Sequence, residues 1–237
     1  MAPAATAAGR ARVLPRAAGG AVPLGAIALV YAFAVGTRTG RDLDGDALAR
    51  VASWRLEAVA DPINHLLNPV TAALAAILLV AVTHARHRRA GRLLAALLIG
   101  CNASAWGLER ALEAIDPLGG EHQRALGPGY FPSGHAAAAM SLAIGAVLAV
   151  PPAHRLAAVV SGAAGTAVLG WAVVGSGSHT PADVIGGFLF AAAWGSVARP
   201  RSAAGAGTFW PSDVAARAPT GGAAPAPEPA GGAARAE

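Results

Sequence analysis

Six apolar stretches divide the chain, and each is close to the length of about 20 residues that an α-helix needs to cross a bilayer. Hydrophobic residues make up 54% of the 237 residues and charged residues only 13%, and the charges fall largely between these stretches. The sequence therefore predicts an all-α integral membrane protein built as a bundle of six transmembrane helices. The predicted helices cover residues 21–37, 63–83, 93–108, 134–150, 156–174 and 182–197.

The basic residues, all 18 of them arginines, indicate how the chain crosses the membrane. A pI near 10.9 could suggest nucleic-acid binding. The arginines, however, stand at the ends of the apolar stretches, which is typical of topology signals rather than of a basic groove. With the N-terminus inside, twelve arginines lie on the cytoplasmic side and six on the other, as the positive-inside rule requires. We therefore expect a multi-pass cell-membrane protein with both termini cytoplasmic and no nucleic-acid partner.

The two ends of the chain differ from the membrane domain predicted for residues 19–199. Residues 1–18 are rich in alanine and arginine, and residues 200–237 are rich in alanine, glycine and proline. Both segments have little to bury and are predicted to be disordered and cytoplasmic. The first apolar stretch follows basic residues, as in a signal peptide, but it is long for one and ends in a poor cleavage site. A retained membrane anchor is therefore predicted.

Residues 38–61 lie between the first two stretches and contain a helical pattern. Leu48, Val51 and Trp54 recur at helical spacing within residues 46–54, which predicts a short helix there. Two interpretations stay open at this point. The helix either lies along the outer membrane surface or forms a structural cap over the bundle.

The first motif that carries chemistry is Pro132-Ser133-Gly134-His135, at the start of the fourth apolar stretch. Ser133 is a good N-cap for the helix that follows. A helix N-terminus offers free backbone N–H groups to an anion, and glycine allows a phosphate to approach the backbone closely. Taken alone, the motif is also compatible with an ordinary capped helix that tolerates a histidine.

The second motif is His179-Thr180-Pro181-Ala182-Asp183, at the start of the last apolar stretch. The spacing of four residues can bring Asp183 to one ring nitrogen of His179, which makes the other nitrogen a better nucleophile. An unpaired carboxylate at the start of a membrane helix would be costly, so a histidine partner explains its presence. The alternative is an aspartate N-cap beside an unrelated loop histidine.

At these two motifs the chain resembles the type 2 phosphatidic acid phosphatase family, part of the lipid phosphatase and haloperoxidase superfamily. The second signature of that family, Pro-Ser-Gly-His, matches residues 132–135, and its third ends in His-x-x-x-Asp, as at His179 and Asp183. The resemblance covers about residues 20–198. It implies a six-helix membrane bundle with both signatures outside the membrane.

The resemblance also implies the roles of individual residues. His179 would be the nucleophile that forms a phosphohistidine, Asp183 would orient it, and His135 would be the general acid. Ser133 and the backbone N–H groups around Gly134 would hold the phosphoryl oxygens. The mechanism implied by the family needs neither a metal ion nor another cofactor.

The sequence departs from the family at the positions of three phosphate-binding cations. Glu109 and Asp116 stand where the first signature has basic residues. Ala172 and Val173 stand where the third signature opens with Ser-Arg. Each lost charge-assisted contact would weaken transition-state binding by about 2–4 kcal/mol.

Two arginines are the expected replacements for these lost cations. Arg110 is next to the first lost position, and Arg124 is in the loop that leads to Pro132. The neighbouring acids Glu109, Glu113 and Asp116 are interpreted as a solvated acidic face at a helix end. A metal ion that bridges these acids to phosphate is the alternative.

The function predicted from these residues is hydrolysis of a lipid phosphate or diphosphate at the outer face of the membrane. Phosphatidic acid, phosphatidylglycerol phosphate and polyprenyl diphosphate are all compatible substrates. The expected partners are this lipid substrate and the membrane lipids, with no prediction of oligomeric state. The alternative is an inactive relative that binds an anionic lipid or a membrane partner. A transporter or channel is disfavoured because charged residues are missing from the middle of the stretches.

Overall fold

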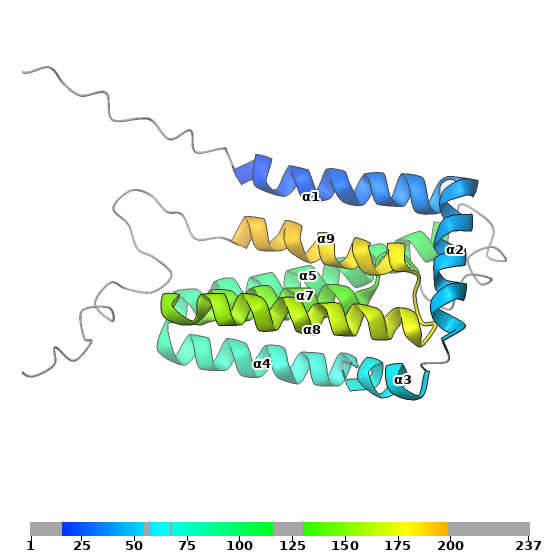
Figure 1. The fold of residues 1–237 in the computed structure, drawn as a ribbon. Coiled ribbons are helices and arrows are strands. Elements are labelled where there is room, and N and C mark those ends of the chain that lie inside the picture. Colours follow the sequence, from blue (N-terminus) through cyan, green and yellow to red (C-terminus); the bar gives the residue numbers. More distant parts are fainter. Residues whose placement is uncertain (1–15, 55–56, 67, 116–129, 199–237) are drawn as a thin grey trace, which may run out of the picture. The chain divides into compact units, whose positions relative to one another are not determined.

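The computed structural model describes residues 16–54, 57–66, 68–115 and 130–198, and every regular element in them is helical. The long helices run alongside one another, and the helix Arg38–Ala52 lies across one end of them (Figure 1). The α-helices are α1 (Arg16–Val30), α2 (Arg38–Ala52), α3 (Glu57–Leu66), α4 (Pro69–Arg86), α5 (Arg88–Ile115), α7 (Gly134–Ala149), α8 (Arg155–Gly175) and α9 (Pro181–Ala198). A π-helical turn, Tyr31–Val35, extends α1, and a 3₁₀ turn, Pro152–His154, precedes α8.

The membrane character of the described chain is clear from helix length and composition. Four segments are long and apolar enough to cross a bilayer: Pro69–Arg86, Arg88–Ile115, Pro152–Gly175 and Pro181–Ala198. A fifth span results if α1 and α2, bent by 87°, are counted together, and α7 is a shorter apolar helix. Large apolar side chains such as Ile77, Leu74 and Val160 are exposed on the outside of the bundle, as expected for contact with lipid. The predicted all-α membrane fold is confirmed, while the number of spans is four or five by these criteria.

The second predicted helix, at residues 63–83, is wrong at its start. Helix α3 ends at Leu66 and a new helix, α4, begins at Pro69. Asn68 caps α4, because its Oδ1 accepts hydrogen bonds from the N–H groups of Val70 (2.8 Å) and Thr71 (3.1 Å). Proline at the first helical position has no N–H to continue the preceding helix. The apolar composition is continuous across this point, but the capping chemistry divides it.

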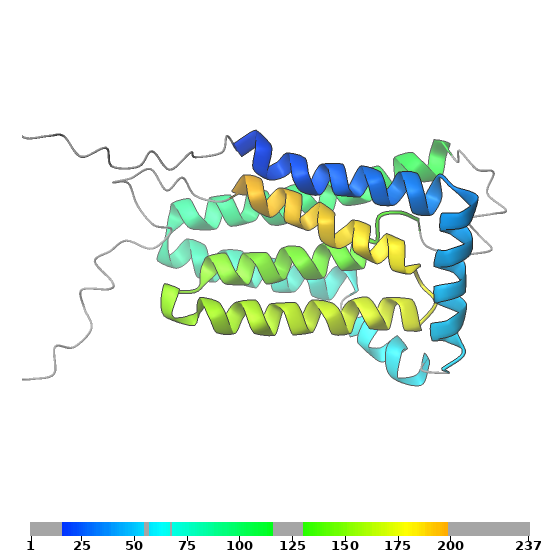
Figure 2. The same ribbon diagram turned by 45° about the horizontal axis from the view of Figure 1, so that its top comes forward.

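The helix predicted at residues 46–54 is longer than expected and begins earlier. Helix α2 starts at Arg38, where the Thr37 side chain accepts a hydrogen bond from the Gly40 N–H (2.9 Å). Its inner side carries Leu48 and Val51, which pack against the core formed by α7, α8 and α9. Figure 2 shows α2 crossing the ends of α8 and α9. The structure therefore supports the interpretation of this segment as a structural cap.

Helix α7 is the centre of the bundle, and it contacts α4, α5, α8 and α9. Small residues make this close packing possible: Ala137 of α7 meets Cys101 and Ala105 of α5 and Ala191 of α9 in one buried cluster. Gly187 of α9 lies against the start of α7. A Cβ atom at this position would overlap the Ser133 carbonyl oxygen. The N-termini of α7 and α9 are thus held side by side.

Candidate active site

The first motif forms the start of α7, as predicted. Ser133 is the N-cap residue, and its Oγ accepts a hydrogen bond from the Ala136 N–H (3.4 Å). The Ser133 side chain is fully buried, whereas Gly134 and His135 are partly exposed. The Gly134 backbone is open, because an added Cβ would meet only Oε2 of Glu109, at 3.8 Å. This part of the helix N-terminus can therefore be approached by an anion.

The second motif forms the start of α9 through a capping box, which the sequence analysis did not identify. The Thr180 N–H donates to Asp183 Oδ2 (3.0 Å), and the Asp183 N–H donates to Thr180 Oγ1 (3.4 Å). The same Asp183 Oδ2 lies 3.5 Å from His179 Nδ1. His179 Nδ1 is buried without a hydrogen bond in this arrangement. Asp183 thus faces the histidine, as the spacing predicted, while also capping its own helix.

The segment before His179 is shaped by the end of α8. The N–H groups of Gly177 and Ser178 donate to the carbonyls of Val174 (3.0 Å) and Val173 (3.1 Å), which is a Schellman motif. Gly177 takes the left-handed conformation that this motif needs, with φ of 68°. His179 therefore follows directly from a defined helix end and precedes a defined helix start.

The two motifs meet at one point of the structure. The Ser133 N–H donates to the Asp183 carbonyl oxygen (2.9 Å), which joins the two helix starts through the backbone. The rings of His135 and His179 are 6.3 Å apart between centroids, and their planes are inclined at 64° to each other. A single phosphate group can contact both rings at this separation, given hydrogen-bond reach of about 3 Å on each side.

The two histidines lie at one end of a cavity of about 470 Å³ between α4, α5 and α7. Near the histidines its lining includes Gly134 and Glu109, and further along it is apolar, with residues such as Ala73, Leu98 and Leu142. Ile77, Ile99 and Trp106 also line the cavity and are more than 60% exposed, so it opens at the outer surface of the bundle. Ser133 is not part of the lining.

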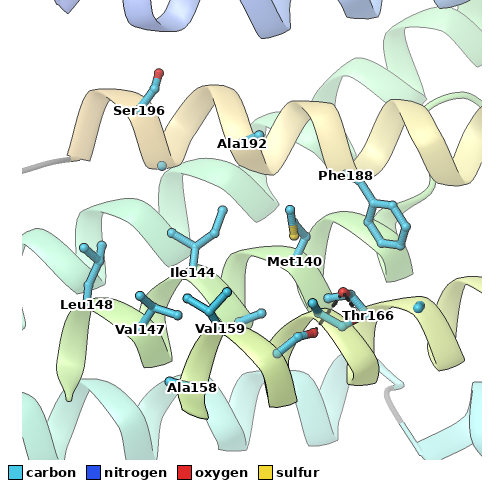
Figure 3. Close-up of a pocket in the computed structure, with 15 residues that line it drawn as sticks. Met140, Ile144, Val147, Leu148, Ala158, Val159, Thr166, Phe188, Ala192 and Ser196 are labelled. Atoms are coloured by element: carbon cyan, nitrogen blue, oxygen red, sulfur yellow. Dashed lines mark hydrogen bonds between the residues drawn. The ribbon is translucent and has the colours of Figure 1, made fainter. Parts of the chain in front are cut away.

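A second cavity of about 490 Å³ lies between α7, α8 and α9 and has no titratable residue in its lining (Figure 3). Its two hydroxyl side chains are turned back to their own helices. Thr166 donates to the Gly162 carbonyl (2.9 Å), and Ser196 donates to the Ala193 carbonyl (2.7 Å). This cavity therefore presents an apolar surface.

Two acidic residues interpreted as solvated have different environments. Glu109 is half-buried, lines the cavity with the histidines, and interacts electrostatically with His179 and Asp183. Its interpretation as part of a solvated acidic face is therefore wrong. Glu113 is paired with Arg110 at 2.6 Å near the bundle surface. Asp116 lies outside the described residues.

The structure does not bring Arg110 into the lining of the cavity. Its guanidinium pairs with Glu113, lies 5.8 Å from the centre of the Trp106 ring, and has a side chain that is 59% exposed. Arg124 lies outside the described residues. Val173, at the position of the expected third cation, is fully buried in the core, as is Ala172. Among the described residues, the cavity lining contains no arginine.

Two further polar residues approach the second motif from α2 and α3, and the sequence analysis missed both. Asp44 Oδ1 accepts a hydrogen bond from the Ala182 N–H (3.0 Å), and the Asp44 carboxylate also pairs with the Thr180 side chain. Burial raises the pKa of the Asp44 carboxyl, and these hydrogen bonds oppose that shift. Asn64 donates to the hydroxyls of Ser176 (3.1 Å) and Ser178 (3.0 Å). No periodicity or motif in the sequence marks either residue.

Comparison with known proteins agrees with this fold and these motifs. Residues 111–203, which include both motifs, match the PAP2 superfamily. The fold is similar to the crystal structure of a transmembrane PAP2-type phosphatidylglycerolphosphate phosphatase from Bacillus subtilis. The TM-score is 0.62 at 18% sequence identity, over 76% of this chain and 94% of that chain. A search of curated proteins found no match to this chain.

The fold and the motifs thus define a multi-pass, all-helical membrane protein with a histidine pair at one end of its bundle. Within it, residues 111–203, which carry both motifs, are similar to the PAP2 superfamily.

Proposed function

We propose that this protein is a membrane phosphatase that hydrolyses a lipid phosphate or diphosphate through a phosphohistidine on His179. One observation carries the proposal. His135 and His179, from two distant motifs, meet at the polar end of a cavity that is otherwise apolar and opens at the side of the bundle. A lipid phosphate fits both parts of this cavity, with its phosphate head group at the polar end beside the histidines and its tail along the apolar remainder.

The proposed reaction has two steps. His179 Nδ1 is buried against Asp183, which leaves Nε2 as the nitrogen for attack on phosphorus. The P–O bond to the lipid breaks as the N–P bond forms, and His135 gives its proton to the leaving oxygen. His135 then takes a proton from water, which attacks the phosphohistidine and releases inorganic phosphate. The N-terminus of α7 at Gly134 would stabilise the phosphoryl oxygens.

The apolar part of the cavity supports a lipid substrate. Its lining on α5 runs from Glu109 to Leu98, which is about 16 Å along a helix. Ala72, Ala73 and Ala76 line the opposite side on α4 and leave room for a chain of methylene groups. A water-soluble phosphate ester would leave this length of the cavity unfilled. The substrate class is therefore proposed to be a lipid with a long apolar tail.

The side of the membrane is also part of the proposal. The histidines lie at the end of the bundle where α7 and α9 begin, opposite the start of α1 and the end of α9 (Figure 1). That opposite end carries Arg86, Arg88, Arg89, Arg92 and Arg155. Because arginine-rich ends tend to stay in the cytoplasm, the histidines are proposed to face the extracytoplasmic side.

A second function is favoured by one observation. Glu109 carries negative charge into the cavity, and the described lining contains no arginine to balance a phosphate. An inactive relative that binds a lipid or a membrane partner would have no need for such a cation. In the catalytic proposal the cation is supplied by Arg124, in the loop before the first motif.

Phosphate release from purified protein in detergent tests the proposal. The substrates are phosphatidic acid, phosphatidylglycerol phosphate and a polyprenyl diphosphate, each with and without a chelator. We expect release by the wild-type protein that falls to background in His179→Ala, because the nucleophile is lost. His154→Ala is the matched control, since His154 is exposed at the opposite end of the bundle. Equal rates for wild type and His179→Ala would favour the inactive relative, and loss of activity with the chelator would favour the metal-bridged alternative.

A further inference from the structure

Asp183 alone does not account for the position of the His179 ring. His179 Nδ1 lies 3.5 Å from Asp183 but has no hydrogen bond, so its side-chain contacts alone do not fix the ring. The His179 residue is nevertheless only 6% exposed. Besides packing, its placement depends on the backbone that carries it, residues 176–182.

This loop is held on its first side by α3. Asn64, 8% exposed, donates its amide hydrogens to the hydroxyls of Ser176 and Ser178, at 3.1 and 3.0 Å. The two hydroxyls also hydrogen-bond each other (2.9 Å). Ala60, on the same helix, lies against Gly175 at the end of α8. A partly buried network of three side chains thus holds the residues immediately before His179.

The loop is held on its other side by α2. Asp44 accepts the Ala182 N–H, one of the backbone donors that the start of α9 leaves free, at 3.0 Å. Asp44 also pairs with the Thr180 side chain, directly after His179. A carboxylate at a helix N-terminus is stabilised by the helix dipole, so this contact is favourable although Asp183 is close by.

We infer that Asp44 and Asn64 are positioning residues for the nucleophile, an inference that rests on the proposed function. They come from the segment between the first two apolar stretches and hold the His179 loop from both sides. The α2–α3 segment is then part of the catalytic apparatus as well as a cap over the bundle. Because a displacement of about 1 Å can lower a reaction rate about 100-fold, loss of either contact should affect the chemical step rather than substrate binding.

The experiment for Asp44 compares three variants in detergent with p-nitrophenyl phosphate, which needs no access through the apolar cavity. We expect Asp44→Ala to lower kcat roughly ten- to 100-fold with KM changed by less than about twofold. Asp44→Asn should recover most of kcat, because its side-chain oxygen can still accept the Ala182 N–H. Asp46→Ala is the matched control, since Asp46 is exposed on the same helix.

The experiment for Asn64 is a double-mutant cycle with Ser178. Asn64→Ala and Ser178→Ala should each lower kcat about tenfold, and the double variant should lose clearly less than the product of the two losses, because both remove the contact between Asn64 and Ser178. Additive losses would overturn the role of Asn64. Wild-type kcat in Asp44→Ala, or no recovery in Asp44→Asn, would overturn the role of Asp44. The role of either residue would also be overturned if the fall in kcat of its variant only matched a fall in the folded fraction, measured by thermal unfolding.

Vanadate binding separates this inference from the proposed function. Vanadate resembles the transition state at phosphorus, so its affinity depends on the placement of the nucleophile. We expect its affinity to fall in parallel with kcat in Asp44→Ala and Asn64→Ala. If the wild type binds vanadate but releases no phosphate, the proposed function fails. Weaker vanadate binding by these variants would then still support the positioning role.

Equal vanadate affinity in wild type and variants overturns the positioning role. A wild type that neither binds vanadate nor releases phosphate overturns both the proposed function and the positioning role.

Discussion

The bundle contains two cavities of similar size, about 470 Å³ beside the histidines and about 490 Å³ between α7, α8 and α9. Both are lined mainly by small and aliphatic side chains. They differ in where their polar groups come from. The second cavity (Figure 3) is lined by turns of three helices that lie away from the histidine end of the bundle. There, hydroxyls such as that of Thr166 donate to carbonyls of their own helix. The first reaches the starts of two helices.

This difference explains why only one cavity is suited to chemistry. In the middle of a helix all backbone N–H groups are used, so a polar ligand finds no donors there. At a helix start the donors are free, and side chains such as His135 and His179 can sit beside them. Volume and apolar lining therefore do not distinguish a catalytic cavity from a lipid-filled groove in a membrane bundle, whereas helix termini do.

The largest expected effect comes from removing the proposed acid of the first cavity. His135→Ala should lower kcat for lipid phosphates about 10²- to 10⁴-fold, because the leaving oxygen then departs without a proton. For p-nitrophenyl phosphate, whose leaving group is stable as an anion, the first step, measured as the burst of p-nitrophenol, should slow much less than for a lipid phosphate. Hydrolysis of the phosphohistidine, in which His135 takes the proton from water, should slow for both substrates. Thr166→Val, in the second cavity, should leave kcat unchanged. Equal losses in the first step for both substrates would argue against His135 as the acid, and a loss in Thr166→Val would contradict the comparison of the two cavities.

A second effect is expected from separating the two helix starts. Gly187→Ala places a Cβ against the Ser133 carbonyl oxygen and the Ala136 methyl group, which must move apart. We expect a loss of about 1–3 kcal/mol in stability, measured by thermal unfolding in detergent, together with lower kcat. Gly165→Ala on α8 is the control, because nothing lies within 4 Å of the added atom. It should be neutral or stabilising by up to about 1 kcal/mol.

Which cavity holds the lipid tail can be tested by filling each cavity in turn with a larger side chain. Ala73→Phe narrows the first cavity and should raise KM about tenfold for a long-chain lipid phosphate, without changing KM for p-nitrophenyl phosphate. Ala163→Phe makes the same change in the second cavity and should alter neither value. The reverse result, with only Ala163→Phe affecting the lipid, would assign the tail to the second cavity.

The smallest effect concerns the charge of Glu109. Glu109→Gln keeps the shape of the side chain and removes the repulsion of a phosphate, so kcat/KM should rise roughly three- to tenfold. Asp46→Asn removes a charge from the exposed side of α2 and should have no effect. A fall in kcat/KM for Glu109→Gln would instead indicate that the carboxylate takes part in the reaction, directly or through a cation.

Much of the fold could be predicted from the sequence because a bilayer imposes strong local constraints. The apolar stretches mark α1, α4, α5, α7, α8 and α9, and Ser133 caps α7 as predicted. The break between α3 and α4 was missed because Asn68-Pro69 lies within a continuous apolar stretch, although its capping signal is visible locally. The early start of α2 was missed for a similar reason, since the Thr37 cap precedes the apolar spacing used to find the helix.

The candidate site likewise has parts that could be predicted from the sequence and parts that could not. The sequence by itself determined the two motifs, the helix starts they form, and the pairing of His179 with Asp183, because all of these act over a few residues. Only the tertiary structure decided that Glu109 faces the histidines while its neighbour Arg110 faces away, because one step along a helix turns a side chain by about 100°. It also decided that Asp44 and Asn64 reach the loop of His179. Contacts between residues more than 100 positions apart depend on how helices pack, and no local pattern encodes them.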